Sequence, residues 1–210
     1  MNAQTEPRPA SSQTGPQSNL QVARPAHLRR IVLTGFMGAG KTTVGRLLAA
    51  RLGWDFLDLD AFIEERTGSS VPSIFASHGE THFRRLESRA LVAALGRSSL
   101  VLALGGGTPE VLTNRLLLEQ TPGTATIFLD APFPTLLDRC LTQALNSGVA
   151  ASGRQPRPNL ADPAAAEARF LKRRPIYRRL ARHTIDTAAL TTQQTVTALL
   201  ARLEGSAPAG

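Results

Sequence analysis

Short apolar runs alternate with longer amphipathic segments along most of this chain. The apolar runs have the length of buried strands and lie at 28–34, 55–58, 100–104, 126–129 and 184–186. Apolar side chains recur at helical spacing near 42–52, 60–67, 72–77, 80–96, 109–119, 133–145, 164–181 and 191–203. Strands that alternate with helices predict an α/β fold, in three layers, around a parallel five-stranded sheet. In such a sheet, ligands bind where the strands end, at their carboxyl edge.

Three signals mark the ends of helices. Gly53 and Gly68 follow helical segments, where glycine adopts the left-handed conformation that closes a helix. Thr108 and Pro109 have the residue types that are common at an N-cap and at the first helical position. Helices are therefore predicted to end just before each glycine and to begin after Thr108.

A glycine-rich segment follows the first predicted strand. Residues 35–42 read Gly-Phe-Met-Gly-Ala-Gly-Lys-Thr and fit G-x-x-x-x-G-K-[ST], the phosphate-binding P-loop. Lys41 is expected to contact the β- and γ-phosphates of a nucleotide, and the Thr42 hydroxyl is expected to ligate Mg²⁺. The alternative is a simple glycine turn, but the strand before the motif and the helix after it favour the P-loop. The predicted nucleotide-binding residues of this segment are Gly38, Ala39, Gly40, Lys41, Thr42 and Thr43.

Two further strands end in residues that suit a ligand site. Asp58 and Asp60 end the second strand, and alternate residues of an extended chain point the same way, so both carboxylates are expected at the carboxyl edge. One could hold Mg²⁺ and the other could accept a proton from a substrate hydroxyl. The alternative role for Asp60 is to cap the next helix. Three glycines at 105–107 follow the third strand and either let the backbone approach a ligand closely or form a flexible turn.

The chain is strongly basic, and arginine supplies most of its positive charge. It carries 24 Lys and Arg against 16 Asp and Glu, for a net charge of +8 and a pI near 11.2, and its only lysines are Lys41 and Lys172. Such a balance suits nucleic acids or small anionic substrates. Aromatic residues make up 5% of the chain and no DNA-binding motif is visible, so we expect small anions and no nucleic acid.

Arginines gather at two places that could grip an anion. Arg84 and Arg85 are adjacent on a predicted helix, so at most one is expected to face a site, while the other is solvated or paired with Glu80 or Glu87. Residues 169–182 contain seven cations and no acid. Such a run is often a solvated face, but beside a phosphate site one or two of these cations are expected to bind an anion.

Some segments lack the periodicity of folded elements. Residues 1–26 predict a disordered tail, with a short transit peptide as the alternative, and 205–210 predict a flexible C-terminal tail. Residues 143–163 are rich in Gly and Pro and predict either a lid that excludes water or a plain loop. One domain is thus expected over 27–204. The lone Cys140 excludes an internal disulfide, and no apolar run approaches the roughly 20 residues of a membrane span, so a cytoplasmic location is expected.

Taken together, these motifs resemble the shikimate kinase family. They follow the family's order from about Leu28 to Leu203: the P-loop, Asp58-Leu59-Asp60, Phe83-Arg84-Arg85-Leu86-Glu87, Leu104-Gly105-Gly106-Gly107, Arg157-Pro158 and Arg173-Arg174-Pro175-Ile176-Tyr177. The resemblance implies a P-loop kinase fold with a lid and a substrate-binding subdomain. It also implies transfer of the γ-phosphoryl group of ATP to the 3-hydroxyl of shikimate, in the biosynthesis of aromatic amino acids.

The resemblance assigns a role to individual residues. It implies that Asp60 binds shikimate hydroxyls and acts as the base, and that Gly106 offers the substrate a backbone N–H. Arg84 and Arg173 would hold the shikimate carboxylate. The remaining roles are Mg²⁺ binding for Asp58, contact with adenine for Arg139, and catalysis and nucleotide binding from the lid for Arg157.

The chain departs from the family's pattern in the lid. The family has Arg-Pro-Leu-Leu there, whereas this chain has Arg-Pro-Asn-Leu at 157–160 in a longer segment, so Arg154 is an alternative to Arg157. The expected partners are ATP and shikimate, with no membrane and with a monomeric chain. Two rival interpretations remain: a gluconokinase, which is a related P-loop kinase, and a nucleic-acid-binding regulator that carries a P-loop domain.

Overall fold

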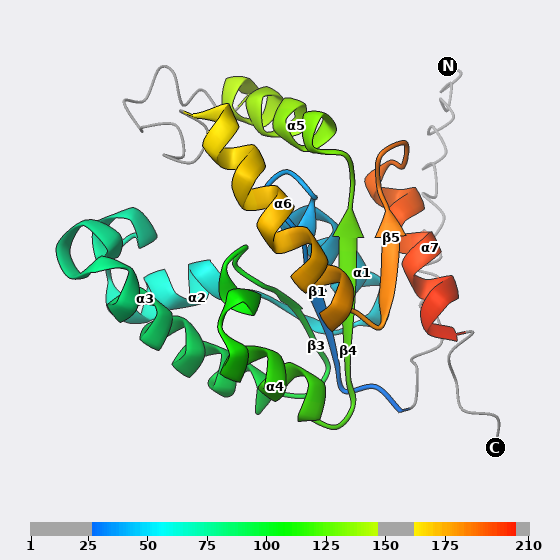
Figure 1. Ribbon diagram of the computed structural model, residues 1–210. Coiled ribbons are helices and arrows are strands. Elements are labelled where there is room, and N and C mark those ends of the chain that lie inside the picture. Colours follow the sequence, from blue (N-terminus) through cyan, green and yellow to red (C-terminus); the bar gives the residue numbers. More distant parts are fainter. Residues whose placement is uncertain (1–26, 147–161, 205–210) are drawn as a thin grey trace, which may run out of the picture.

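The computed structural model describes residues 27–146 and 162–204, and these form a parallel sheet between two layers of helices (Figure 1). The five strands are ordered β2-β3-β1-β4-β5. They are β1 (Arg30–Thr34), β2 (Asp55–Asp58), β3 (Leu100–Ala103), β4 (Thr124–Asp130) and β5 (His183–Asp186). All four strand pairings are parallel, which confirms the predicted α/β architecture.

The helices connect these strands and cover both faces of the sheet (Figure 1). They are α1 (Lys41–Leu52), α2 (Leu59–Thr67), α3 (Val71–Leu95), α4 (Leu112–Gln120), α5 (Phe133–Asn146), α6 (Pro163–Leu180) and α7 (Thr192–Glu204), with a short 3₁₀ helix η1 at Thr108–Glu110. The predicted tails lie outside the described residues, as do 147–161 of the predicted lid. The ends of that predicted loop were wrong, because 143–146 complete α5 and Pro163 begins α6.

The central strand β1 is buried on both sides, which explains its unbroken apolar run. Ile31 and Leu33 belong to a core cluster with side chains of α1 and α7, such as Leu48 and Leu199. Val32 points to the other face and packs in a cluster formed with α3 and α4. Both faces need apolar residues because neither is left to water.

Local signals set several helix ends, but one predicted signal was wrong. Gly53 and Gly68 have φ angles of 62° and 65° and close α1 and α2 as predicted. The prediction that Thr108 caps a helix was wrong: α4 begins at Leu112 after Val111, and Thr108 opens η1. Its hydroxyl instead donates a hydrogen bond to the buried Glu87 carboxylate, 2.6 Å away.

Helices α2 and α3 extend away from the sheet on one side of the molecule (Figure 1). Ser70 caps α3 by accepting a hydrogen bond from the N–H of Ser73. Gly79, with φ 76° and ψ 174°, interrupts the helix, so α3 has two arms. These arms match the two separate helices predicted at 72–77 and 80–96.

Candidate active site

The P-loop joins β1 to α1 at the carboxyl edge of the sheet. Gly38 and Gly40 have φ angles of 76° and 83°, a region that residues with a Cβ rarely adopt. A Cβ on Gly38 would also lie 2.3 Å from the carbonyl oxygen of Leu136 in α5. The tight turn therefore requires glycine, and it directs the free N–H groups at the start of α1 toward the space above the loop.

Two P-loop side chains have well-defined partners. Lys41 Nζ donates to the carbonyl oxygens of Gly35 and Phe36, at 2.9 and 3.0 Å, and so lies within the curve of the loop. The Thr42 hydroxyl donates to Asp58 Oδ2 at 2.8 Å. This contact brings together the two residues that the sequence nominated as metal ligands, from α1 and from the end of β2.

The sequence interpretation placed both Asp58 and Asp60 on the second strand, but only Asp58 lies there. Strand β2 ends at Asp58, whose Oδ1 caps α2 by accepting hydrogen bonds from the N–H groups of Asp60 and Ala61. Asp60 therefore lies in the first turn of α2, and Asp58 performs the capping considered for Asp60. The Asp60 carboxylate still reaches the glycine loop, because a Cβ on Gly105 would be only 2.7 Å from its Oδ1.

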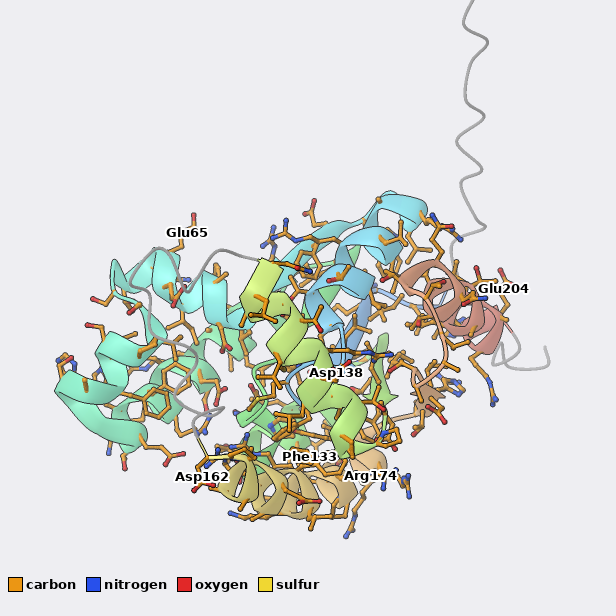
Figure 2. All side chains as sticks on the ribbon, turned by 90° about the horizontal axis from the view of Figure 1, so that it is seen from above. Glu65, Phe133, Asp138, Asp162, Arg174 and Glu204 are labelled. Atoms are coloured by element: carbon orange, nitrogen blue, oxygen red, sulfur yellow. The ribbon has the colours of Figure 1, made fainter. Side chains whose placement is uncertain are left out.

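A cavity of about 810 Å³ opens over the P-loop. Its other walls are α5, on which Figure 2 shows Asp138, and the first residue of α7, Thr192. Arg139 of α5 lines this cavity and donates to Thr187, through Nη1 to the hydroxyl at 3.1 Å and through Nη2 to the carbonyl. The predicted nucleotide-binding residues that line it are Gly38, Gly40, Lys41, Thr42, Thr43 and Arg139.

Arg84 reaches the glycine loop from α3. A Cβ on Gly107 would lie 2.2 Å from Arg84 Nη2, so the guanidinium lies directly against that glycine. Two acids hold it: Glu87 accepts from Nη1 at 2.9 Å, and Glu80 accepts from Nη2 at 3.0 Å. Burial alone would lower the pKa of Arg84, but the charges and hydrogen bonds of Glu87 and Glu80 outweigh burial and raise it. Of the two adjacent arginines, Arg85 is exposed, as the interpretation of the pair allowed, and Arg84 is the one that pairs with Glu80 and Glu87.

Arg173 reaches the same loop from α6. Its Nε donates to Glu110 Oε1 at 2.8 Å, its Nη2 forms an ion pair with the same oxygen at 2.6 Å, and its Nη1 would be 3.5 Å from a Cβ on Gly106. The Tyr177 hydroxyl, one turn further along α6, donates to the Gly106 carbonyl oxygen. The structure thus brings Asp60, Arg84 and Arg173 together around the three glycines.

Comparison with known proteins gives this arrangement a family. A model of the family described as shikimate kinase matches residues 37–204. The chain belongs to the shikimate kinase family. The shikimate kinase of Symbiobacterium thermophilum is 40% identical over 174 residues, which cover 83% of this chain and 95% of that protein. The resemblance inferred from the motifs is therefore confirmed.

Solved structures agree with this assignment. A shikimate kinase from Acinetobacter baumannii in complex with shikimate superposes with a TM-score of 0.76 at 34% identity, over 86% of this chain and 96% of that one. A gluconokinase from Sinorhizobium meliloti 1021 covers 84% of this chain and 92% of its own, with a TM-score of 0.51 and 19% identity, and so shares the fold alone.

Several residues of this shikimate kinase site were not predicted. Glu87 is fully buried, and its carboxylate links Arg84 to the Thr108 hydroxyl. Its spacing of three residues from Arg84 is a recognisable helical signal. Glu110 and Tyr177 gave no comparable signal, since their partners lie 63 and 71 residues away.

The arginine-rich run on α6 is neutralised by acids on other elements. Asp130, at the end of β4, accepts hydrogen bonds from Arg174, at 2.9 Å from Nη2, and from Arg178 at 3.1 Å. Figure 2 shows Arg174 on this helix. Glu110 pairs with Arg173 and with Lys172. The absence of acids within 169–182 therefore did not mean an absence of partners.

Thr42 and Asp58 are the residues with the donor chemistry for a hard cation. Both offer oxygen, and Mg²⁺ characteristically takes one or two protein oxygens and completes its shell with phosphates and waters. Within 27–146 and 162–204, no three His, Cys, Asp or Glu side chains gather as a metal site.

The helices described in 27–146 and 162–204 include none that is long and apolar enough to cross a membrane.

Proposed function

We propose that the chain transfers the γ-phosphoryl group of ATP to the 3-hydroxyl of shikimate, giving shikimate 3-phosphate and ADP on the route to chorismate and the aromatic amino acids. The observation that carries this proposal is the convergence of Asp60, Arg84 and Arg173 on the glycine loop beside a P-loop. Shikimate is a hydroxylated carboxylate. Paired guanidiniums suit its carboxylate, and a carboxylate suits its hydroxyls.

On the acceptor side, Asp60 would orient the reacting hydroxyl and act as the general base. As the hydroxyl oxygen attacks the γ-phosphorus, its proton passes to the Asp60 carboxylate, and the bond from the γ-phosphorus to the β–γ bridging oxygen breaks to release ADP. Arg84 and Arg173 would hold the carboxylate of the same substrate, and the Gly106 N–H would contribute one further hydrogen bond. Fixing both ends of a rigid ring places the hydroxyl for attack.

On the donor side, the backbone N–H groups of residues 38–43 would cradle the phosphates, with Gly38, Ala39, Gly40 and Thr43 among them. Lys41 would exchange the carbonyl oxygens of its own loop for β- and γ-phosphate oxygens. Arg139 would lie against the adenine from the wall of the cavity. Arg157, with Arg154 as the alternative, would add positive charge at the transferring group, and both lie outside the described residues.

Mg²⁺ is the metal that we assign to this site. Thr42 and Asp58 would hold it, since the hydroxyl and the carboxylate already meet at 2.8 Å. When bound, Mg²⁺ neutralises charge on the β- and γ-phosphates. We further propose a cytoplasmic, monomeric enzyme whose catalytic domain covers 27–204, with its lid between α5 and α6, where 147–161 lie outside the described residues, and with tails at 1–26 and 205–210.

A coupled assay of ADP release tests the function directly. Purified full-length chain with ATP and Mg²⁺ should release ADP rapidly with shikimate, and only at background rate with gluconate or with no acceptor. Turnover with gluconate in place of shikimate would reassign the enzyme to the rival kinase class. Tight, salt-sensitive binding of duplex DNA without turnover would favour the nucleic-acid rival.

A further inference from the structure

Glu110 stands at the end of η1, three residues after Gly107, and its carboxylate is shared by two cations of α6. Oε1 accepts a hydrogen bond from Arg173 Nε at 2.8 Å and forms an ion pair with Arg173 Nη2 at 2.6 Å, and Oε2 lies 3.3 Å from Lys172 Nζ. The Arg173 side chain is 15% exposed and that of Glu110 is 23% exposed. The Glu110–Arg173 pair is therefore partly shielded from water, where charge attraction is stronger than at an open surface.

The edge of the guanidinium that Glu110 occupies is informative. A guanidinium presents its N–H groups in a fixed planar fork, with Nε and Nη2 on one edge and Nη1 on the other side. Glu110 takes the Nε–Nη2 edge. Nη1 is left on the side of Gly106, 3.5 Å from where a Cβ would stand. The carboxylate of Glu110 thus fixes one edge of the guanidinium, and Nη1 remains beside Gly106 and the Tyr177 hydroxyl.

The state of charge of Glu110 supports this arrangement. Burial alone would raise the pKa of the Glu110 carboxyl, but the charges and hydrogen bonds of Arg173 and Lys172 outweigh burial and lower it below its usual value. Glu110 is therefore an anion at neutral pH. It parallels Glu87, which accepts from Nη1 of the other arginine at the loop, Arg84.

We propose that Glu110 is a positioning residue for substrate: it holds Arg173 so that Nη1 faces the carboxylate of the acceptor. This inference rests on the proposed function, in which Arg173 binds that carboxylate. A competing arrangement is physically possible. In it, the Glu110 carboxylate occupies the position on Arg173 that the substrate carboxylate would take. The two arrangements predict opposite changes in substrate affinity when the charge of Glu110 is removed, so they are separable by experiment.

The test is Glu110→Gln in the full-length chain, with kcat and KM measured for shikimate and for ATP. Gln retains the size of Glu but accepts more weakly from a guanidinium. The KM for shikimate should rise on the order of tenfold, with the KM for ATP unchanged and kcat affected less. The double variant with Arg173→Lys should lose less than the two single losses combined, because both changes break the same contact.

Three controls make the result specific. Glu119→Gln removes the same charge from an exposed position of nearby α4 and should change neither KM. Glu110→Asp keeps the charge with a shorter reach and should fall between the parent and Glu110→Gln, which also covers the case in which Glu110→Gln folds poorly. In the parent, shikimate affinity should fall as pH drops through the lowered pKa of Glu110, and in Glu110→Gln this fall should be smaller, because one of the titrating carboxylates is gone.

An unchanged KM for shikimate in folded Glu110→Gln would overturn the inference. A lower KM would also overturn it, because it would show that Glu110 competes with the substrate for Arg173. Failure of the proposed function looks different. In that case the unmodified chain would show no shikimate-dependent ADP release at all, and the inference would fall with it.

Discussion

At position 41, the kind of cation matters as much as its charge. The ammonium of Lys41 lies between two backbone carbonyls of its own loop, at 2.9 and 3.0 Å, and so fits within a tight curve of backbone. A planar guanidinium is wider and presents its donors in a fixed fork. This chain uses arginine for nearly every other cation, so lysine at this place is consistent with a steric requirement of the loop.

Substitution of Lys41 measures that requirement. Lys41→Ala should lower kcat on the order of 10²–10³-fold, because a preorganised contact to the transferring phosphates is lost, while the circular dichroism spectrum stays that of the parent. Lys41→Arg should recover little of this loss. Turnover near the parent value in Lys41→Arg would contradict the phosphate contact assigned to the ammonium.

The three glycines of the glycine loop, at 105–107, should respond differently to the addition of one methyl group. On Gly105 the methyl would meet Asp60 Oδ1 at 2.7 Å, and on Gly107 it would meet the Arg84 guanidinium at 2.2 Å. On Gly106 its nearest neighbours are at 3.5 and 3.6 Å, an ordinary contact. None of the three has a positive φ, so space rather than backbone conformation decides the outcome.

Gly105→Ala should therefore lower kcat by displacing the base, on the order of 10²-fold for a shift near 1 Å. Gly107→Ala should chiefly raise the KM for shikimate, because it moves Arg84. Gly106→Ala is the matched control and should remain the most active of the three in steady-state assays. Equal losses in all three variants would show that general loosening of the loop, not these two contacts, determines activity.

At the scale of elements, sequence patterns located every strand, because buried parallel strands are short apolar runs and the helices between them are periodic. Helix ends set by local chemistry, as at Gly53 and Gly68, were also predictable. The error at Thr108 has a tertiary cause: its hydroxyl partner, Glu87, comes from α3, 21 residues earlier. The same reason hid Glu110 from the sequence analysis, while Asp60 and Arg84 were found through motifs that lie within one segment.

The Tyr177 hydroxyl links helix α6 to the glycine loop by a hydrogen bond, and the titration of this hydroxyl can be followed directly. Burial raises the pKa of the Tyr177 hydroxyl above its usual value, so the phenol remains a hydrogen-bond donor to Gly106. This residue is the only tyrosine of the chain, and phenolate absorbance therefore reports on it alone. In the native protein that absorbance should appear well above pH 10, and in denaturant it should appear near the ordinary value of about 10.

The sign of the effect on stability follows from the same shift. A group whose pKa is raised on folding stabilises the fold fully below its unfolded pKa and loses that contribution as pH rises through the folded value. Alkaline unfolding of the parent should therefore steepen above about pH 10, and Tyr177→Phe should lack this component. Phenolate absorbance that rises near pH 10 while the helical signal is intact would contradict a buried, bonded hydroxyl.

At the scale of the whole molecule, part of the positive charge on α6 is paired with acids of other elements. On α6, four of the seven cations in 169–182 form ion pairs with Glu110 or Asp130, which lie on other elements. Part of the charge is thus used to fix α6 against η1 and β4. An ion-paired helix beside a phosphate site fits small anionic substrates better than the uniform basic face that a nucleic acid needs.

The core also indicates how much of the chain the fold requires. Leu28 is buried, and the backbone N–H groups of Arg29 and Arg30 both donate to the carbonyl of Gly123, so the folded part extends to the first described residues. At the other end, Leu203 of α7 is 1% exposed.

A chain restricted to 27–204 retains all of these contacts and should match the full chain in melting temperature, kcat and both KM values. Leu203→Ala in the same truncated chain is the matched control and should lose about 2–5 kcal/mol of unfolding free energy. A truncated chain as unstable as that control, or one that folds but has lost turnover, would show that residues outside 27–204 belong to the working domain.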